Sequence, residues 1–255
     1  MVKTVFITGA SRGIGRALAL EYAKKGSLIV LSSRNTEDLN KVKSWISSNG
    51  GTCHTIHCNV ASLDEMREAA NQAKKLLGNI DLAILNAGFA ESFLFSKSNP
   101  ESLVKIFEVN VFGLANGLSC LVPIMLEQGG GTIAGVGSLA ESRGIPGNAA
   151  YCASKSAAGH LLEAARCELA PKNIKVMTIK PGFVRTEMTS GNQFNMPFLI
   201  DPDEAAKIIV KGIEKEKRII AFPLIMSLFS YFGKSVPAAL FDLILSGRTF
   251  HKSVD

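Results

Sequence analysis

The sequence has few of the residues that mark several classes of protein. Its five cysteines are an odd number, and no two of them show the CxxC spacing of a zinc or redox motif. We therefore expect neither a disulfide framework nor a metal site, and unpaired thiols favour a reducing compartment, the cytoplasm. Aromatic residues make up only 7%, and no basic run is interleaved with them. The net charge of +6 is thus interpreted as solvated surface, and nucleic acid is not expected as a partner.

The sequence also lacks segments that target a chain or separate domains. We expect no secretory leader, because Met1-Val2-Lys3 runs directly into the apolar residues 4–8. No linker, repeat or low-complexity stretch interrupts the rest. A length of 255 residues is within the range of one α/β domain. We therefore predict a single dinucleotide-binding and catalytic domain over residues 1–255.

What is present is a regular alternation of short β-branched segments with longer amphipathic ones. The expected strands are 4–8, 28–32, 52–58, 81–86, 131–136, 174–180 and 218–222. Helical spacing is found at 66–77, 103–121 and 157–169, with start signals at Ser62-Leu-Asp-Glu65, Asn99-Pro100 and Asp201-Pro202. This alternation predicts an α/β fold: one doubly wound, Rossmann-type domain with a central parallel sheet of about seven strands and helices on both faces.

A glycine-rich turn follows the first predicted strand and opens a helix. Glycines in such a turn allow a tight bend and a close approach of the backbone to a pyrophosphate, which the helix N-terminus also attracts. The spacing is GxxxGxG, not the commoner GxGxxG, and a glycine-rich turn alone is also compatible with a simple connection. The expected cofactor-binding residues of this turn are Gly9, Ser11, Arg12, Gly13, Ile14 and Gly15.

The end of the second strand indicates which dinucleotide binds. Enzymes that prefer NAD usually place an acid there for the ribose hydroxyls, whereas this strand ends in Ser33-Arg34-Asn35. Arg34 can pair with a 2′-phosphate, Ser33 can hydrogen-bond it, and Arg12 projects toward the same region. Either arginine alone is compatible with an ordinary surface cation. Together, and without the acid, they favour NADP(H).

Three further residues have the chemistry of proton transfer. Tyr151 and Lys155 are four residues apart on a predicted helix, so both point into one cleft, and Ser138 follows the fifth strand at the ligand-binding edge of the sheet. A free tyrosine has a pKa near ~10, and we expect the Lys155 ammonium, with the positive nicotinamide ring, to lower it. A YxxxK pair by itself is common on surface helices. The pair indicates proton transfer here because it occurs together with the other motifs.

Taken in order, these motifs make the chain resemble the short-chain dehydrogenase/reductases over nearly its whole length. The resemblance implies that Tyr151 is the acid/base, Ser138 binds the substrate oxygen, and Lys155 binds the nicotinamide ribose. It implies that the Asn110 backbone holds a water linking Lys155 to solvent. The implied cofactor contacts further along the chain are Asn59, Val60, Asn86, Ala87, Gly88, Tyr151, Lys155, Pro181, Gly182, Val184 and Thr186. Two positions depart from the family pattern: Asn59 replaces a more usual aspartate, and Gly137 replaces a second serine.

The substrate side is predicted from the segments that vary in this family. Residues 139–146 and a lid at 187–200 are the candidates, with an apolar lining over a hydrophobic carbonyl compound. For each lid side chain, packing on the core is the competing interpretation. The expected substrate contacts are Ser138, Met188, Phe194 and Met196.

The C-terminal extension, residues 219–255, is unusually apolar. Pro223, Gly233-Lys234, Pro237 and Asp242 interrupt it, so it is not expected to span a membrane. We expect a last strand followed by helices that cover the substrate pocket or a subunit interface of a homodimer or homotetramer. The alternative is peripheral membrane contact, helped by basic residues. Those residues are Lys215, Lys217, Arg218 and Lys234.

The sequence therefore predicts an NADP(H)-dependent oxidoreductase that interconverts a small-molecule carbonyl and an alcohol by hydride transfer. One alternative is a sensor or scaffold protein that binds NADP(H) without turnover, but such proteins usually lose the tyrosine or the lysine. Another is an epimerase or dehydratase on the same fold, which the absence of an extended substrate domain disfavours.

Overall fold

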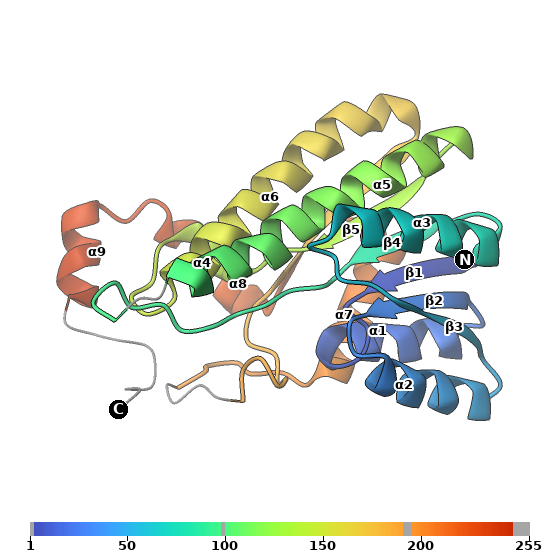
Figure 1. Ribbon diagram of the computed structural model, residues 1–255. Helices are drawn as coiled ribbons and strands as arrows, with labels where there is room; N and C mark the ends of the chain where they lie inside the picture. Colours follow the sequence, from blue (N-terminus) through green and yellow to red (C-terminus); the bar gives the residue numbers. More distant parts are fainter. Residues whose placement is uncertain (1–2, 98–99, 191–194, 247–255) are drawn as a thin grey trace.

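The computed structural model describes residues 3–97, 100–190 and 195–246, which fold around a seven-stranded parallel sheet (Figure 1). The strand order is β3-β2-β1-β4-β5-β6-β7. Strands β2 and β3 are therefore added on one side of β1, and β4 to β7 are added on the other side, so the order switches between β1 and β4. All seven predicted strands are present, and no end differs from the prediction by more than one residue. Their bounds are β1 Thr4–Thr8, β2 Leu28–Ser33, β3 Thr52–His57, β4 Leu82–Leu85, β5 Gly131–Val136, β6 Ile174–Pro181 and β7 Ile219–Phe222.

Helices cover both faces of this sheet, which confirms the doubly wound architecture. One layer contains α1, α2 and α7, and the other contains α3, α5 and α6 (Figure 1). The central strand β4 reads Leu-Ala-Ile-Leu with all four residues buried, as expected for a parallel strand covered on two sides. The helix bounds are α1 Gly13–Lys24, α2 Thr36–Ser48, α3 Leu63–Leu77, α4 Pro100–Phe107, α5 Gly113–Glu127, α6 Ala149–Leu169, α7 Pro202–Glu214, α8 Leu224–Gly233 and α9 Ala238–Leu245.

The predicted helix starts are partly as expected. Ser62 caps α3, and its hydroxyl accepts from the Glu65 backbone N–H at 3.3 Å. The reciprocal half of the capping box is absent, because the Glu65 carboxylate accepts from the Asn59 N–H at 2.9 Å instead. Asp201 stands before α7 without a side-chain cap bond, since its carboxylate pairs with Arg185 Nε at 2.9 Å. Asn99 lies outside the described residues.

The helix predicted over 103–121 is longer and contains a π-helical turn. Residues Glu108–Phe112 form this turn between α4 and α5, and a wide turn of this kind often marks a functional position. Within the described ranges, the continuous helix Pro100–Glu127 is the one long and apolar enough to cross a membrane by length and composition, and 44% of its apolar window is buried. Its packing beside α3 and α6 is that of a core helix.

The apolar C-terminal segment forms β7, α8 and α9, and the two helices lie beyond the carboxyl ends of the strands (Figure 1). Neither helix has a buried residue. Lys217 and Arg218 precede β7, whereas α8 follows it, so these cations lie at the opposite edge of the sheet from α8. Of the basic residues named for the membrane alternative, Lys234 stands at the end of α8, whereas Lys217 and Arg218 do not flank the apolar helices.

Candidate active site

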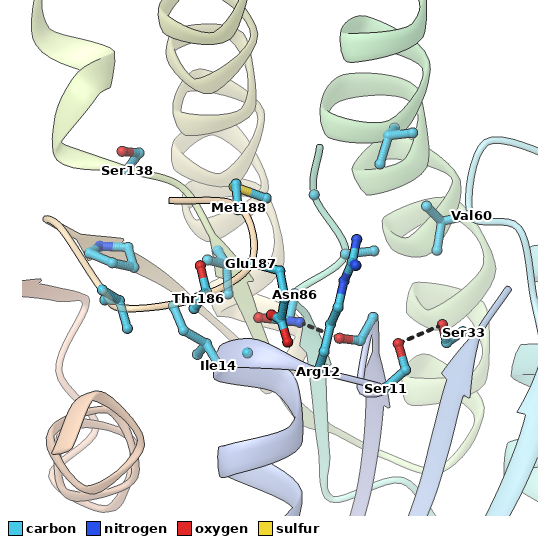
Figure 2. Close-up of a pocket in the computed structure, with 18 of the residues that line it drawn as sticks. Ser11, Arg12, Ile14, Ser33, Val60, Asn86, Ser138, Thr186, Glu187 and Met188 are labelled. Carbon is cyan, nitrogen blue, oxygen red and sulfur yellow. Dashed lines mark hydrogen bonds between the residues drawn. The ribbon is translucent and has the colours of Figure 1, made fainter. Parts of the chain in front are cut away.

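A cavity of about 610 Å³ opens at the carboxyl edge of the sheet, where the strand order reverses. Doubly wound folds bind their ligands at this edge because the loops after adjacent strands diverge there. Figure 2 shows the glycine loop, the end of β2 and the 186–188 segment around it. Its lining residues are Gly9, Ser11, Arg12, Gly13, Ile14, Ser33, Arg34, Asn35, Cys58, Asn59, Val60, Asn86, Ala87, Gly88, Val109, Val136, Gly137, Ser138, Tyr151, Lys155, Pro181, Gly182, Val184, Thr186, Glu187, Met188 and Thr189.

The glycine turn has the close approaches that require glycine. Gly9 has φ +65°, and a Cβ there would lie 2.7 Å from the Ala87 Cα, closer than any real contact. Gly15 does not line the cavity. A Cβ at Gly15 would lie 2.4 Å from the Gly9 carbonyl oxygen, so this glycine lets α1 pack against the loop. Gly15 therefore has a packing role, and the cofactor contact predicted there stays a prediction.

Asn86 braces the turn from the neighbouring strand. Its Nδ2 donates to the carbonyl oxygens of Thr8 at 3.1 Å and Gly9 at 2.9 Å. The Thr8 hydroxyl in turn accepts from the backbone N–H groups of Asn86 and Ala87. The side chain of Asn86 therefore orders the loop, although the residue also lines the cavity as predicted.

The far end of the cavity carries the positive charge of Arg12 and Arg34. Arg12 and Arg34 are exposed, and neither forms an ion pair within the ranges that the structure describes. The Ser33 hydroxyl donates to the Ser11 hydroxyl at 3.1 Å, which ties the end of β2 to the glycine loop (Figure 2). Asn35 caps α2 by accepting from the Asp38 N–H. The chemistry of this end suits a phosphate.

Ser138, Tyr151 and Lys155 meet at the inner wall of the cavity, as predicted. Ser138 caps the short 3₁₀ turn η2 (Leu139–Ser142), accepting from the Ala140 N–H at 3.1 Å. Lys155 lies on α6 one turn after Tyr151, with its Nζ 5.7 Å from the Tyr151 ring centroid. The same ammonium donates to the Val136 carbonyl oxygen at 2.9 Å.

The electrostatics of this group differ from our expectation. Burial raises the pKa of Tyr151, and the hydrogen bond with Ser138 offsets part of that increase. Burial also lowers the pKa of Lys155 to about 8, against a weaker opposing effect of the Glu141 carboxylate. Lys155 is not among the groups that shift the pKa of Tyr151 here, and its ammonium donates to the Val136 carbonyl oxygen. The lowering that we expect from Lys155 together with a bound nicotinamide ring stays a prediction. A raised pKa keeps the Tyr151 hydroxyl protonated and able to donate.

Asn110 sits in the π-helical turn and is buried, outside the cavity lining. Its Oδ1 accepts from the Phe89 N–H at 2.7 Å, while its Nδ2 donates to the Phe89 carbonyl and to the Ser154 hydroxyl. A Cβ on Gly88 would lie 3.5 Å from both Asn110 Oδ1 and Lys155 Nζ. The Asn110 side chain therefore fixes the loop after β4 beside Lys155. The water held by its backbone stays a prediction.

Several lining residues were not predicted from the sequence. Each flanks a motif by one or two positions, and that adjacency is the signal that could have found them: Asn35, Cys58, Val109, Val136 and Gly137. Glu187 and Thr189 also line the cavity and belong to the predicted lid, although they were not named individually. Among the predicted substrate contacts, Ser138 and Met188 line the cavity and Met196 does not. Phe194 lies outside the described residues. Cys58 adds no reactive thiol, because burial raises its pKa to about 12.

The comparisons with known proteins, by family model, by sequence and by structure, all find the same family. The family model described as short chain dehydrogenase matches residues 3–196. An uncharacterized oxidoreductase of Myxococcus xanthus is 33% identical over 240 residues, covering 94% of this chain and 95% of the relative. The 3-oxoacyl-[acyl-carrier-protein] reductase FabG of Staphylococcus epidermidis is 32% identical over 191 residues, which cover 74% of this chain and 78% of the relative. A short-chain dehydrogenase/reductase of Burkholderia phymatum, solved in complex with NAD, superposes with a TM-score of 0.83 at 22% identity. The superposition covers 100% of this chain and 98% of that structure.

Proposed function

Since the chain belongs to the short-chain dehydrogenase/reductase family of oxidoreductases, we propose that it reduces a hydrophobic small-molecule carbonyl, or oxidises the matching alcohol, with NADP(H). The observation that carries the proposal is that one cavity has Ser138, Tyr151 and Lys155 at its inner wall and, at its far end, two arginines that form no ion pair with any described residue. We place this reaction in the cytoplasm, where NADPH favours the reductive direction.

The residues present fit a nicotinamide dinucleotide. Gly9 and Gly13 leave open a strip of backbone at the N-terminus of α1, where N–H groups and the helix dipole favour a pyrophosphate. When bound, the nicotinamide supplies or accepts the hydride. Lys155 would hold its ribose, and Val184 and Thr186 would cover the carboxamide.

The protein's own part of the reaction is positioning and proton transfer. Ser138 donates a hydrogen bond to the carbonyl oxygen and so orients the carbonyl carbon. Tyr151 gives its proton to that oxygen as negative charge develops there, which is general acid catalysis. Burial favours this direction, since it keeps the hydroxyl protonated. In the reverse direction Tyr151 accepts the alcohol proton, so oxidation is expected to need a higher pH than reduction.

NADPH oxidation against a panel of aldehydes, cyclic ketones, 3-oxoacyl thioesters and steroid ketones tests the function. We expect turnover with at least one hydrophobic class. Met188, which is 44% exposed and lines the cavity, supplies an apolar surface on the substrate side. Tight NADPH binding without turnover on any class would instead support a sensor or scaffold protein.

NADPH is expected to bind at least tenfold more tightly than NADH. A tenfold ratio corresponds to ~1.4 kcal/mol of binding free energy. Charge-assisted hydrogen bonds from Arg12 and Arg34 to a phosphate are strong enough to supply that difference. Titration by protein or nicotinamide fluorescence measures both affinities. Replacing Ser33 by Asp together with Arg34 by Ala should reverse the order, whereas Arg16→Ala, outside the cavity, should leave it unchanged. Equal affinities for the two cofactors would refute the assignment.

Helix α8 turns large apolar side chains toward the solvent and a serine toward the protein, the reverse of an ordinary surface helix. We propose that it lies at an interface between copies of this chain. Ser230 faces the body of the protein and donates to the Leu139 carbonyl oxygen at 2.9 Å. Six large side chains lie on the opposite half of the helix and are 48–73% exposed: Leu224, Ile225, Leu228, Phe229, Tyr231 and Phe232. An apolar surface of this kind usually marks an association site.

The protein is accordingly expected to be a homodimer or homotetramer that needs no detergent and does not sediment with anionic vesicles. Light scattering coupled to size-exclusion chromatography gives the mass, and Phe229→Lys should lower it because it introduces a charge into the proposed interface. Lys172→Ala, on an exposed turn, serves as the control. Vesicle binding that resists high salt would favour the peripheral membrane alternative.

A further inference from the structure

A carboxylate lies behind the active site, among groups that the proposed chemistry does not use. The side chain of Glu141, on η2, is only 9% exposed, and its Oε1 accepts from Lys180 Nζ at 2.6 Å. Lys180 is itself only 21% exposed. The second oxygen, Oε2, has no hydrogen-bond partner among the described residues. Burying such a group is costly unless the surroundings compensate, so its presence calls for a physical reason.

Two glycines make the space that this carboxylate occupies. A Cβ at Gly159, on α6, would lie 2.9 Å from Glu141 Oε2. A Cβ at Gly137 would lie 3.3 Å from the same oxygen. Gly137 is the position where the family more often has serine, so the departure from the family pattern is matched by a buried carboxylate at that point. The niche is thus formed by the residue after β5, by α6 and by the end of β6.

Each wall of this niche belongs to a segment that carries the active site. Glu141 lies on the turn that Ser138 caps, and its backbone N–H bonds the Ser138 carbonyl oxygen at 3.3 Å. Gly159 is one helical turn beyond Lys155 on α6. Lys180 directly precedes Pro181 and Gly182, which line the cavity. The ion pair therefore links the turn of Ser138 to the end of β6, and its carboxylate lies against Gly159 on the helix that carries Lys155.

We propose that Glu141, paired with Lys180, is a positioning residue that fixes the turn carrying Ser138 and supplies the counter-charge for the buried Lys155 ammonium. This role deepens the proposed function and rests on it for its catalytic consequence. It assigns no contact with substrate or cofactor to either residue.

The charge balance around Lys155 supports this assignment. Among the described residues, Tyr151 on its own helix lies beside Lys155 and Glu141 on η2 acts on its charge. Lys180 is paired with Glu141, and Arg143 donates to the Val236 carbonyl at 2.9 Å. Burial lowers the pKa of Lys155 to about 8, and Glu141 acts in the opposite direction. Loss of the Glu141 charge should therefore lower the Lys155 pKa further, so that the ammonium loses its proton at a lower pH.

Glu141→Gln tests the counter-charge without any cofactor, because it keeps the shape of the side chain and removes the charge. Competitive labelling of Lys155 with acetic anhydride, followed by mass spectrometry between pH ~6 and ~10, reports the protonation of this lysine. We expect the labelling midpoint to fall by about half a pH unit or more. Glu163→Gln, which removes a 66% exposed carboxylate from α6, should leave it unchanged. An unchanged midpoint in Glu141→Gln would overturn the counter-charge role.

A double-mutant cycle tests the niche through stability alone. Alanine in place of a helical glycine ordinarily stabilises a helix. Because its Cβ would displace the Glu141 carboxylate, Gly159→Ala should instead lower the Tm of the parent by about 2–4 °C. In the Glu141→Ala background the same change should raise the Tm, since the space is then free. Equal effects of Gly159→Ala in both backgrounds would contradict the fixing role.

These two measurements separate the inference from the proposed function. A parent protein that turns over no carbonyl would refute the function while the labelling and the stability cycle still decide the role of Glu141. If the function holds, Glu141→Gln should also move the alkaline decline of NADPH affinity to lower pH. A merely structural residue would weaken binding equally at every pH.

Discussion

Replacing Tyr151 by Phe is expected to lower the rate of carbonyl reduction by about 10²–10⁴-fold, the usual contribution of general acid catalysis. Tyr151 lines the cavity together with Ser138 and shares a side-chain hydrogen bond with it, so its phenol is placed to give a proton to the oxygen that Ser138 binds. The ring of phenylalanine fills the same space, so folding and NADPH affinity should be retained. The measurements are kcat with the best carbonyl substrate of the panel and the Kd for NADPH.

Ser138→Ala is the informative comparison for this result. It removes a hydrogen bond to the substrate but no proton donor, so kcat should fall less than in Tyr151→Phe while the NADPH affinity stays unchanged. Ser138 also caps η2, and loss of such a cap costs about 1 kcal/mol of stability. Rates should therefore be measured well below the Tm. If Tyr151→Phe kept more than about a tenth of the parent activity, the acid/base role would be wrong.

Lys155→Ala is expected to cause two separate defects, a fall in kcat of about 10²-fold or more and NADPH binding weaker by about tenfold. The substitution removes the proposed ribose contact and leaves the Val136 carbonyl without its 2.9 Å donor. Stopped-flow turnover and fluorescence titration measure the two effects independently.

The control for this variant is Lys172→Ala, which removes an exposed lysine beyond the end of α6. It should leave turnover, NADPH affinity and Tm at parent values. A Lys155→Ala protein that loses turnover but binds NADPH as tightly as the parent would show that the lysine does not contact the cofactor.

The sequence by itself determined the sheet and the place of most cavity residues. The strands are runs of β-branched and apolar residues whose pattern is local, so Thr4–Thr8 and Gly131–Val136 could be located to the residue. Crossover handedness then brings the carboxyl ends of parallel strands to one edge. Residues next to those ends, such as Ser33 and Ser138, must therefore line the same edge of the sheet, although they are far apart in the chain and lie at opposite ends of the cavity.

The tertiary structure alone decided how individual side chains are used. Gly15 packs α1 instead of lining the cavity, and Asn110 holds the Phe89 backbone, because each contact joins segments that local patterns cannot relate. Only the tertiary structure shows that the pKa of Tyr151 is raised, because the burial of the ring depends on every segment packed around it. Glu141 gave no signal in the sequence. Its role follows from Lys180 and Gly159, which only the folding of β6 and α6 onto one turn brings to its carboxylate.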